Sequence, residues 1–154
     1  MIDRLAEKGN PKAFRFTRPK QDGRFDFSFS GIKTAVRDLI TKRGQTPFEM
    51  EDLCASFQEA VASWLVEKTI DACRFKKVND IVVGGGVSAN SRLRSHLSEE
   101  AQPYGIRVWF PPLFLTVDNA AMIARRGFEL YRRGRRSDWK ISAHPHLKIG
   151  GPSC

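Results

Sequence analysis

The sequence predicts an α/β fold with parallel strands, and two observations support this prediction. In the second half of the chain, short apolar runs alternate with amphipathic segments, which is the order of strand–helix–strand units. The chain has 154 residues, of which 41% are hydrophobic and 28% are charged, a composition typical of globular rather than disordered proteins. A chain of this length can bury a core without disulfides or a structural metal.

The first half of the chain predicts a loop, a strand and two helices. Residues 1–24 are polar and interrupted by glycine and proline, so we expect a loop or the remnant of a preceding region there. Residues 25–30 alternate with a period of two, which predicts a half-buried strand, and the apolar spacing over residues 32–40 predicts an amphipathic helix. We treat residues 25–150 as the main lobe.

A long second helix is expected to begin at a capping box. Thr46 and Glu49 have the required spacing, and Pro47 suits the first helical position. The helix then presents one apolar face, made of Leu53, Phe57, Ala60, Val61, Trp64, Leu65 and Ala72.

The second half predicts two strands and two helices. Residues 80–83 form a short apolar run of the kind found in fully buried strands, and residues 106–110 predict a second strand that ends at a Pro-Pro pair. Between them, a helix is expected to bury Leu93, Leu97 and Ala101. A last helix is expected from about Asp118 to Arg133, with a face of mostly small residues: Ala120, Ala124, Gly127, Phe128 and Tyr131.

The charge balance points to an anionic partner. Lysine and arginine number 26 against 17 acidic residues, a net charge of +9. Such a charge favours binding to nucleic acid, a nucleotide or a lipid surface, and the alternative is a solvated basic surface. The three cysteines form no CxxC pair, which is typical of reduced thiols, and no apolar run approaches the roughly 20 residues that cross a bilayer. We therefore expect a cytoplasmic protein without membrane contact.

Three consecutive glycines follow the first predicted strand of the second half. Gly84, Gly85 and Gly86 allow positive φ angles and close approach of a ligand, and the next helix offers free N–H groups to it. Ser88 or Asn90 could cap that helix or bind a ribose or base. The alternative is a tight turn without a ligand. A dinucleotide site is excluded because no acidic residue follows the next strand.

An aspartate lies between the second strand and the last helix. Asp118 is expected at the carboxyl ends of the strands, where a carboxylate can hold a divalent metal that bridges to a phosphate. The alternative is an Asp N-cap. His144 and His146 are assigned to a loop in the tail rather than to a metal site.

Three motifs together resemble one family, the tRNA N6-adenosine threonylcarbamoyltransferases (TsaD/Kae1/Gcp, formerly O-sialoglycoprotein endopeptidases). They are FSFSGIKTA at residues 27–35, GGVSAN at residues 85–90 followed by Leu93-Arg94, and DNAAMIA at residues 118–124. The resemblance covers almost the whole chain. One departure is Thr116-Val117, where the family usually has Cys-Thr before the aspartate.

The resemblance implies a fold and a reaction. The fold would be the C-terminal part of a ribonuclease-H-like, actin-like ATPase (ASKHA) lobe. The reaction would transfer a threonylcarbamoyl group from threonylcarbamoyl-adenylate to N6 of adenosine 37 in tRNAs that read ANN codons. Gly85, Gly86 and Asn90 would contact the adenylate, and Asp118 would be a metal ligand. The metal would be iron or zinc.

The family also carries an N-terminal HxxxH metal motif that this chain lacks. We therefore expect the chain to be the C-terminal portion of such an enzyme, to be inactive alone, not to retain the metal alone, and to expose apolar surface. Expected partners are the N-terminal lobe, tRNA and the other proteins of the modification complex. Possible tRNA contacts are Arg125, Arg126, Arg132, Arg133, Arg135 and Arg136. The alternative is a non-catalytic nucleotide- or tRNA-binding module of the same fold.

Overall fold

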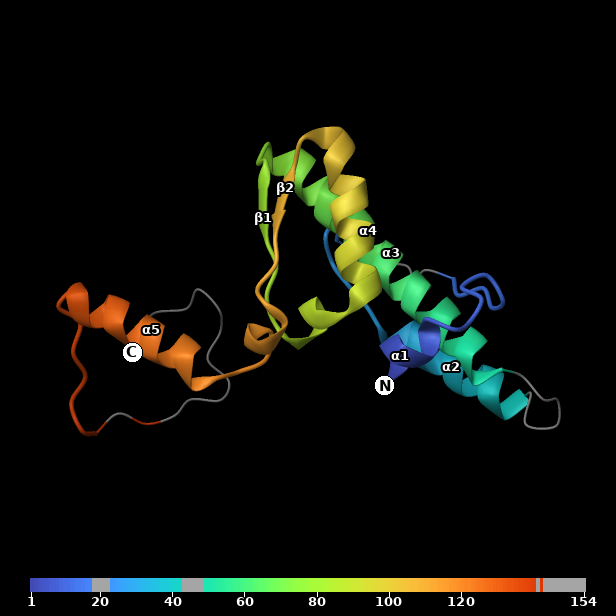
Figure 1. Ribbon diagram of the computed structural model, residues 1–154, viewed down its shortest axis with the longest axis horizontal. Coiled ribbons are helices and arrows are strands. Elements are labelled where there is room, and N and C mark those ends of the chain that lie inside the picture. The colour runs from blue at the N-terminus through green and yellow to red at the C-terminus, as the bar shows by residue number, and fades with distance from the viewer. Residues whose placement is uncertain (18–22, 43–48, 141, 143–154) are drawn as a thin grey trace. The chain divides into compact units, whose positions relative to one another are not determined.

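The computed structural model describes residues 1–17, 23–42, 49–140 and 142 (Figure 1). The chain divides into two compact units, Met1–Val117 and Asp118–Cys154. In the first unit the elements are, in chain order, α1 (Ile2–Ala6), α2 (Ser30–Lys42), α3 (Met50–Lys76), β1 (Asp80–Val82), α4 (Ser91–Ala101) and β2 (Arg107–Trp109). The second unit contains α5 (Ala120–Arg132).

The predicted parallel strand–helix–strand unit is confirmed. β1 and β2 pair in parallel, with Ile81 opposite Val108, and α4 is the helix that connects them. The backbone N–H of Val83 donates to the carbonyl of Trp109 at 2.9 Å and continues the pairing past the end of β1. The described part of the chain is therefore a mixed α/β structure around a small parallel sheet.

The core lies where α3 and α4 cover one face of this sheet (Figure 1). The face that the sequence predicted for α4 is confirmed, since Leu93, Leu97 and Ala101 are all buried. Their buried neighbours come from α3, from β1 and from the residue that precedes β2: Val66, Ile70, Cys73, Ile81 and Ile106.

The other face of the sheet is open, so the prediction of a fully buried strand is wrong. Val82 is 83% exposed and Trp109, its partner in the register, is 55% exposed. In parallel sheets an open face is unusual, because helices normally cover both sides. Here the described residues of the first unit supply helices to one side only.

The strand predicted over residues 25–30 is also wrong, because no strand forms there and α2 begins at Ser30. The alternation instead places the rings of Phe27 and Phe29 on one side, stacked with centroids 6.1 Å apart. The ring of Phe25 packs against the ring of Phe75 on α3, with centroids 5.5 Å apart. A strand needs a neighbour for its backbone hydrogen bonds, and no described residue of this unit pairs with this segment.

The start of α3 differs from the predicted capping box. Glu49 takes the N-cap position and makes no side-chain cap bond, whereas Thr46 and Pro47 lie outside the described residues. Only part of the predicted apolar face is fully buried. α3 packs against both α1 and α4, so buried residues lie on more than one side of the helix.

The first residues are more ordered than the expected loop, because they contain α1 and are attached to α3. The buried hydroxyl of Ser56 accepts from the N–H of Phe14 and donates to the carbonyl of Asn10, both at 3.1 Å. Asp52 accepts from the N–H of Asn10 at 2.6 Å. The segment before residue 17 therefore packs as part of the first unit.

α5 has an apolar face that is exposed among the described residues. None of its residues is buried, and the ring of Phe128 and the side chain of Ile123 are 52% and 76% exposed. A Cβ added at Gly127 would meet no described atom within 4 Å, so the described residues of this unit do not show the close packing expected of the small residues. The expectation that the whole chain exposes apolar surface stays a prediction.

None of the described helices combines the length and the apolar character needed to cross a membrane.

Candidate functional site

The glycine turn after β1 has one position that only glycine fits. Gly85 has φ of 87° and ψ of 166°, a region of backbone conformation that is essentially restricted to glycine. A Cβ at Gly84 would meet no atom within 4 Å, and one at Gly86 would lie 3.8 Å from Val117 Cγ1. The backbone conformation therefore requires glycine at position 85. Among the described residues, Gly84 has open space beside it, and a Cβ at Gly86 would make an ordinary contact with Val117.

Asn90 caps α4, as one of the predicted alternatives stated. Its Oδ1 accepts from the backbone N–H of Leu93 at 2.9 Å. Ser88, the other candidate cap, lies in a short 3-10 turn (Gly86–Ala89) and is only 1% exposed. Its hydroxyl finds no hydrogen-bond partner among the described residues. The capping role belongs to Asn90 because Asn90 directly precedes the helix.

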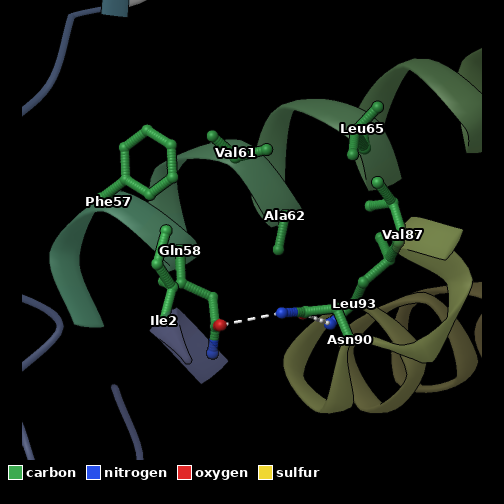
Figure 2. A pocket seen from close by; sticks show the side chains of 9 residues that line it. All are labelled: Ile2, Phe57, Gln58, Val61, Ala62, Leu65, Val87, Asn90 and Leu93. Atoms are coloured by element: carbon green, nitrogen blue, oxygen red, sulfur yellow. Dashed lines mark hydrogen bonds between the residues drawn. The ribbon is translucent and has the colours of Figure 1, made fainter. Parts of the chain in front are cut away.

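The side chain of Asn90 also joins three helices. Its Nδ2 donates to Oε1 of Gln58 on α3 at 2.7 Å and to Oδ1 of Asp3 on α1 at 3.2 Å. Figure 2 shows Asn90 facing Gln58 at the edge of an apolar pocket of about 310 Å³. Asp3 and Gln58 could not be predicted from the sequence, because a contact across 87 or 32 residues leaves no local pattern.

Arg94 links the two loops that follow the strands. Its Nε donates to the carbonyl of Ser88 at 2.6 Å, and its NH2 group donates to the carbonyl of Pro111 at 2.7 Å. The guanidinium lies 4.9 Å from the ring centroid of Phe110. The resemblance included Arg94 without assigning it a role, and the structure shows that it holds the glycine turn beside the end of β2.

An ion pair attaches the first turn of α4 to α3. Arg92 donates to both carboxylate oxygens of Glu59, at 2.6 and 3.0 Å. This hydrogen bonding holds the pKa of Glu59 below its usual value, although partial burial acts in the opposite direction. Ser63 adds a weaker hydrogen bond of 3.3 Å to the same carboxylate.

Replacing Glu59 by glutamine is expected to lower the free energy of unfolding by about 1 kcal/mol at neutral pH. Because the pKa of Glu59 is lower in the folded state, its contribution is present above the unfolded pKa of about 4.3 and is lost as pH falls through the folded value. Urea unfolding at several pH values should show the difference between the two proteins shrinking in acid. Glu99→Gln is the control, since a carboxylate oxygen of Glu99 lies 3.9 Å from the guanidinium of Arg92 and the side chain is more exposed. An equal loss of stability in Glu99→Gln would contradict the stabilising role of the Arg92–Glu59 pair.

Asp118 is exposed and begins the second unit. The alternative that it caps the last helix is wrong, because the cap is Asn119, whose Oδ1 accepts from the N–H of Met122 at 3.1 Å. The described residues give Asp118 no group of three His, Cys, Asp or Glu side chains that could hold a metal. Its predicted position beside the glycine turn stays a prediction. His144 and His146 lie outside the described residues.

The arginines considered for tRNA contact lie on α5 and just after it. The guanidinium of Arg125 pairs with the carboxylate of Glu129, with a nitrogen-to-oxygen distance of 2.6 Å. The guanidinium carbon of Arg136 lies 3.8 Å from the ring centroid of Tyr131. Arg132 lies 5.9 Å from the ring centroid of Phe128. All of them are exposed, so the second unit carries a basic surface.

In the first unit, a parallel strand ends in a glycine turn that leads into a capped helix. This arrangement is typical of the α/β proteins that bind ligands at the carboxyl ends of their strands. The comparisons with known proteins narrow this class. Residues 1–125 match the family described as tRNA N6-adenosine threonylcarbamoyltransferase (TsaD). The chain therefore belongs to the TsaD family, as the resemblance implied.

Proteins with this name in several bacteria are similar to the chain. Those of Symbiobacterium thermophilum and Thermotoga neapolitana are 43% and 44% identical to it over 150 residues, and one from Clostridium botulinum (strain 657) is 45% identical over 152 residues. Each alignment covers 97% of this chain but only 44% or 45% of the relative. The chain spans less than half the length of the curated relatives it matches.

Members of the family bind a divalent metal. The described residues do not fit such a metal by themselves, because they contain no group of three His, Cys, Asp or Glu side chains that could hold it.

Proposed function

We propose that this chain is the portion of a tRNA N6-adenosine threonylcarbamoyltransferase that positions the adenylate of threonylcarbamoyl-adenylate. The observation that carries the proposal is the family match over residues 1–125, which includes the glycine turn, Asn90 and Asp118. The reaction would move the threonylcarbamoyl group to N6 of adenosine 37 of tRNA, in the cytoplasm where that tRNA is used. Binding and orientation are the contributions that these residues are suited to make.

In this proposal the adenylate lies against the glycine turn. Only Val117 Cγ1 would lie near a Cβ at Gly86, at 3.8 Å, so a ligand could approach the backbone there, and Asn90 is held by three hydrogen bonds. Arg94 fixes the same turn through the carbonyl of Ser88. Such prior ordering lets a ligand bind without the cost of arranging these groups.

The remaining parts of the site belong to the portion of the relatives that this chain does not match. We propose that Asp118 supplies one metal ligand and that the other ligands come from that portion, so that the chain alone is inactive. The fold would then be the C-terminal part of an ASKHA lobe formed mainly by residues 25–150. Residues 1–24 would be the remnant of the preceding region, of which the part before residue 17 packs on α3. The open sheet face at Val82 and Trp109 supports this, since exposed apolar surface is typical of interfaces.

Binding of the adenylate can be tested with adenosine monophosphate (AMP) as the probe. NMR titration of the isotope-labelled chain is expected to shift the backbone resonances of residues 84–90. Gly86→Ala is expected to weaken AMP binding about ten-fold without lowering stability, because its Cβ has room in the protein but occupies the space left for the ligand. Gly127→Ala is the matched control. No shift at the glycine turn would contradict the proposal.

The basic surface is proposed to contact tRNA phosphates. Replacing Arg133 and Arg135 together by alanine is expected to reduce the slope of log affinity for tRNA against log salt by about 1–2. Fluorescence anisotropy at several salt concentrations measures this slope. The control removes two charges from α2 by Arg37→Ala and Lys42→Ala, and an equal loss of slope in both variants would mean that net charge alone matters.

A further inference from the structure

A groove of about 260 Å³ lies between residues 25–27 and the last turns of α3. Phe27 and Val78 in its walls are 44% and 45% exposed, so the groove is open to solvent. It lies away from the proposed nucleotide site, because Gln58 and Lys76 are separated by about 27 Å along α3 at 1.5 Å per residue. The walls are mostly apolar and are formed by Phe25, Phe27, Ala72, Cys73 and Val78.

Contacts within the first unit fix both walls of the groove. Arg24 donates to the two carboxylate oxygens of Asp71 at 2.7 and 2.9 Å, and its guanidinium carbon lies 4.8 Å from the ring centroid of Phe75. Nζ of Lys68 donates to the carbonyl of Arg24 at 2.9 Å and lies 5.6 Å from the ring centroid of Phe27. The groove therefore exists before a ligand binds, which lowers the cost of binding.

Two lysines beside the groove carry charges that no described carboxylate neutralises. Lys76 is the last residue of α3 and lines the groove, and Lys77 follows it. Neither forms an ion pair with a described residue.

The backbone at the end of α3 has a conformation that favours glycine, but the residue there is a lysine. Lys77 has φ of 54°, in the left-handed region. The N–H of Lys77 donates to the carbonyl of Arg74 at 3.3 Å, and the N–H of Val78 donates to that of Cys73 at 3.0 Å. These two bonds form a Schellman motif, in which glycine usually takes the left-handed position. The charge of Lys77 thus stands beside the groove at a cost in stability that glycine would avoid.

The chemistry of the groove favours an apolar group over a nucleobase. The attraction of cations to a helix C-terminus explains lysines at the end of α3 but not the open apolar walls beside them. The hydroxyl of Thr69, which also lines the groove, already donates to the carbonyl of Leu65 at 2.7 Å. A nucleobase would bury its polar edge among apolar side chains, whereas an apolar side chain carries no such cost.

We propose that this groove is a docking site for an acidic segment of a partner protein. A large apolar side chain of that segment fills the groove, and its flanking carboxylates pair with Lys76 and Lys77. The two unpaired charges determine the sign of the partner, because a basic segment would be repelled. The net charge of +9 favours the same partner at longer range.

The proposal can be tested by NMR titration of the isotope-labelled chain with the synthetic peptide DEDLFDED. We expect the peptide to shift the backbone resonances of residues 25–27 and 68–78. The peptide DEDAADED, which keeps the charges but lacks the large apolar side chains, is expected to bind about ten-fold more weakly or less tightly still. No shift in these two segments, or equal binding of both peptides, would overturn the proposal.

Substitutions of the two lysines test the charges separately from the groove. Lys76→Gln and Lys77→Gly are each expected to weaken binding of DEDLFDED about two- to five-fold. Lys77→Gly is also expected to raise the urea midpoint of unfolding by about 0.3–0.5 M, so that binding falls while stability rises. Lys8→Gln is the matched control, since the neighbouring Gly9 lies against Glu51 at the other end of α3. Equal losses of binding in Lys8→Gln would overturn the proposal.

Filling the groove tests the apolar contact. Ala72→Leu is expected to weaken binding of DEDLFDED about ten-fold, because the larger side chain occupies the space of the ligand. The urea midpoint of this variant shows whether it is folded, and unchanged binding by the folded variant would overturn the proposal.

RNA is the competing partner, and labelled oligouridylate is the probe for it. Anisotropy is expected to show that Lys76→Gln and Lys8→Gln change oligouridylate binding equally. If oligouridylate instead loses affinity only in Lys76→Gln while DEDLFDED does not bind, the groove is an RNA site and the proposal is wrong. AMP binding at residues 84–90 is not involved in either result, so the proposed function is tested separately.

Discussion

Replacing Leu97 by alanine is expected to lower the free energy of unfolding by about 2–5 kcal/mol, the largest effect of any single substitution considered for this chain. Leu97 is 3% exposed and lies on α4 within the buried cluster formed with α3 and the sheet. Truncation removes three buried carbon atoms and leaves a cavity that the surrounding helices can fill only in part. Urea unfolding followed by circular dichroism measures the change.

Leu113→Ala is the matched control for this substitution. Leu113 lies in the same unit but is 61% exposed, so its truncation is expected to change stability by less than about 0.5 kcal/mol. Similar losses for both leucines would mean that α4 does not pack against α3 and the sheet in the way described.

Replacing Gly85 by alanine is expected to cost about 1–3 kcal/mol, because alanine does not adopt its backbone conformation without strain. The cost is purely conformational, since a Cβ at this position would meet no atom within 4 Å. Strain at this position is also expected to displace the following turn, including Ser88 and Asn90. AMP binding should therefore weaken together with stability.

Gly84→Ala separates the conformational effect from the loss of a glycine as such. Gly84 directly precedes Gly85, does not have a positive φ and likewise has open space around its Cβ position. Its substitution is expected to leave the free energy of unfolding within about 0.5 kcal/mol of the original. Equal losses at the two glycines in urea unfolding would contradict the conformation described for Gly85.

The sequence predicted the parts of the fold that depend on local periodicity. The spacing of Leu93, Leu97 and Ala101 identified the buried face of α4, and the strand–helix–strand order identified the parallel pair. The prediction failed at residues 25–30 and at Val82, because a strand and a buried sheet face both need partners from elsewhere. Periodicity shows that a segment suits such a partner but not whether the described chain supplies one.

For the candidate site, sequence reasoning identified Asn90 and the glycine turn but not what holds them. Helix capping depends on residues that are neighbours in the sequence, so Asn90 could be predicted as one of two possible caps of α4. For α5 the alternative of an Asp118 cap is wrong by one residue, because the cap is Asn119. Asp3 and Gln58 reach Asn90 only through the packing of α1 and α3 against α4.

The measurement that tests the account most directly is the formation of threonylcarbamoyl-adenosine by a chimeric enzyme. This chain replaces the 150 residues that it matches in the Symbiobacterium thermophilum relative, and tRNA is incubated with threonylcarbamoyl-adenylate and that relative's partner proteins. Mass spectrometry of the tRNA nucleosides is expected to show the product with the chimera, much less with its Gly86→Ala variant, and none with this chain alone. A folded chimera without product, or full turnover by this chain alone, would contradict the account.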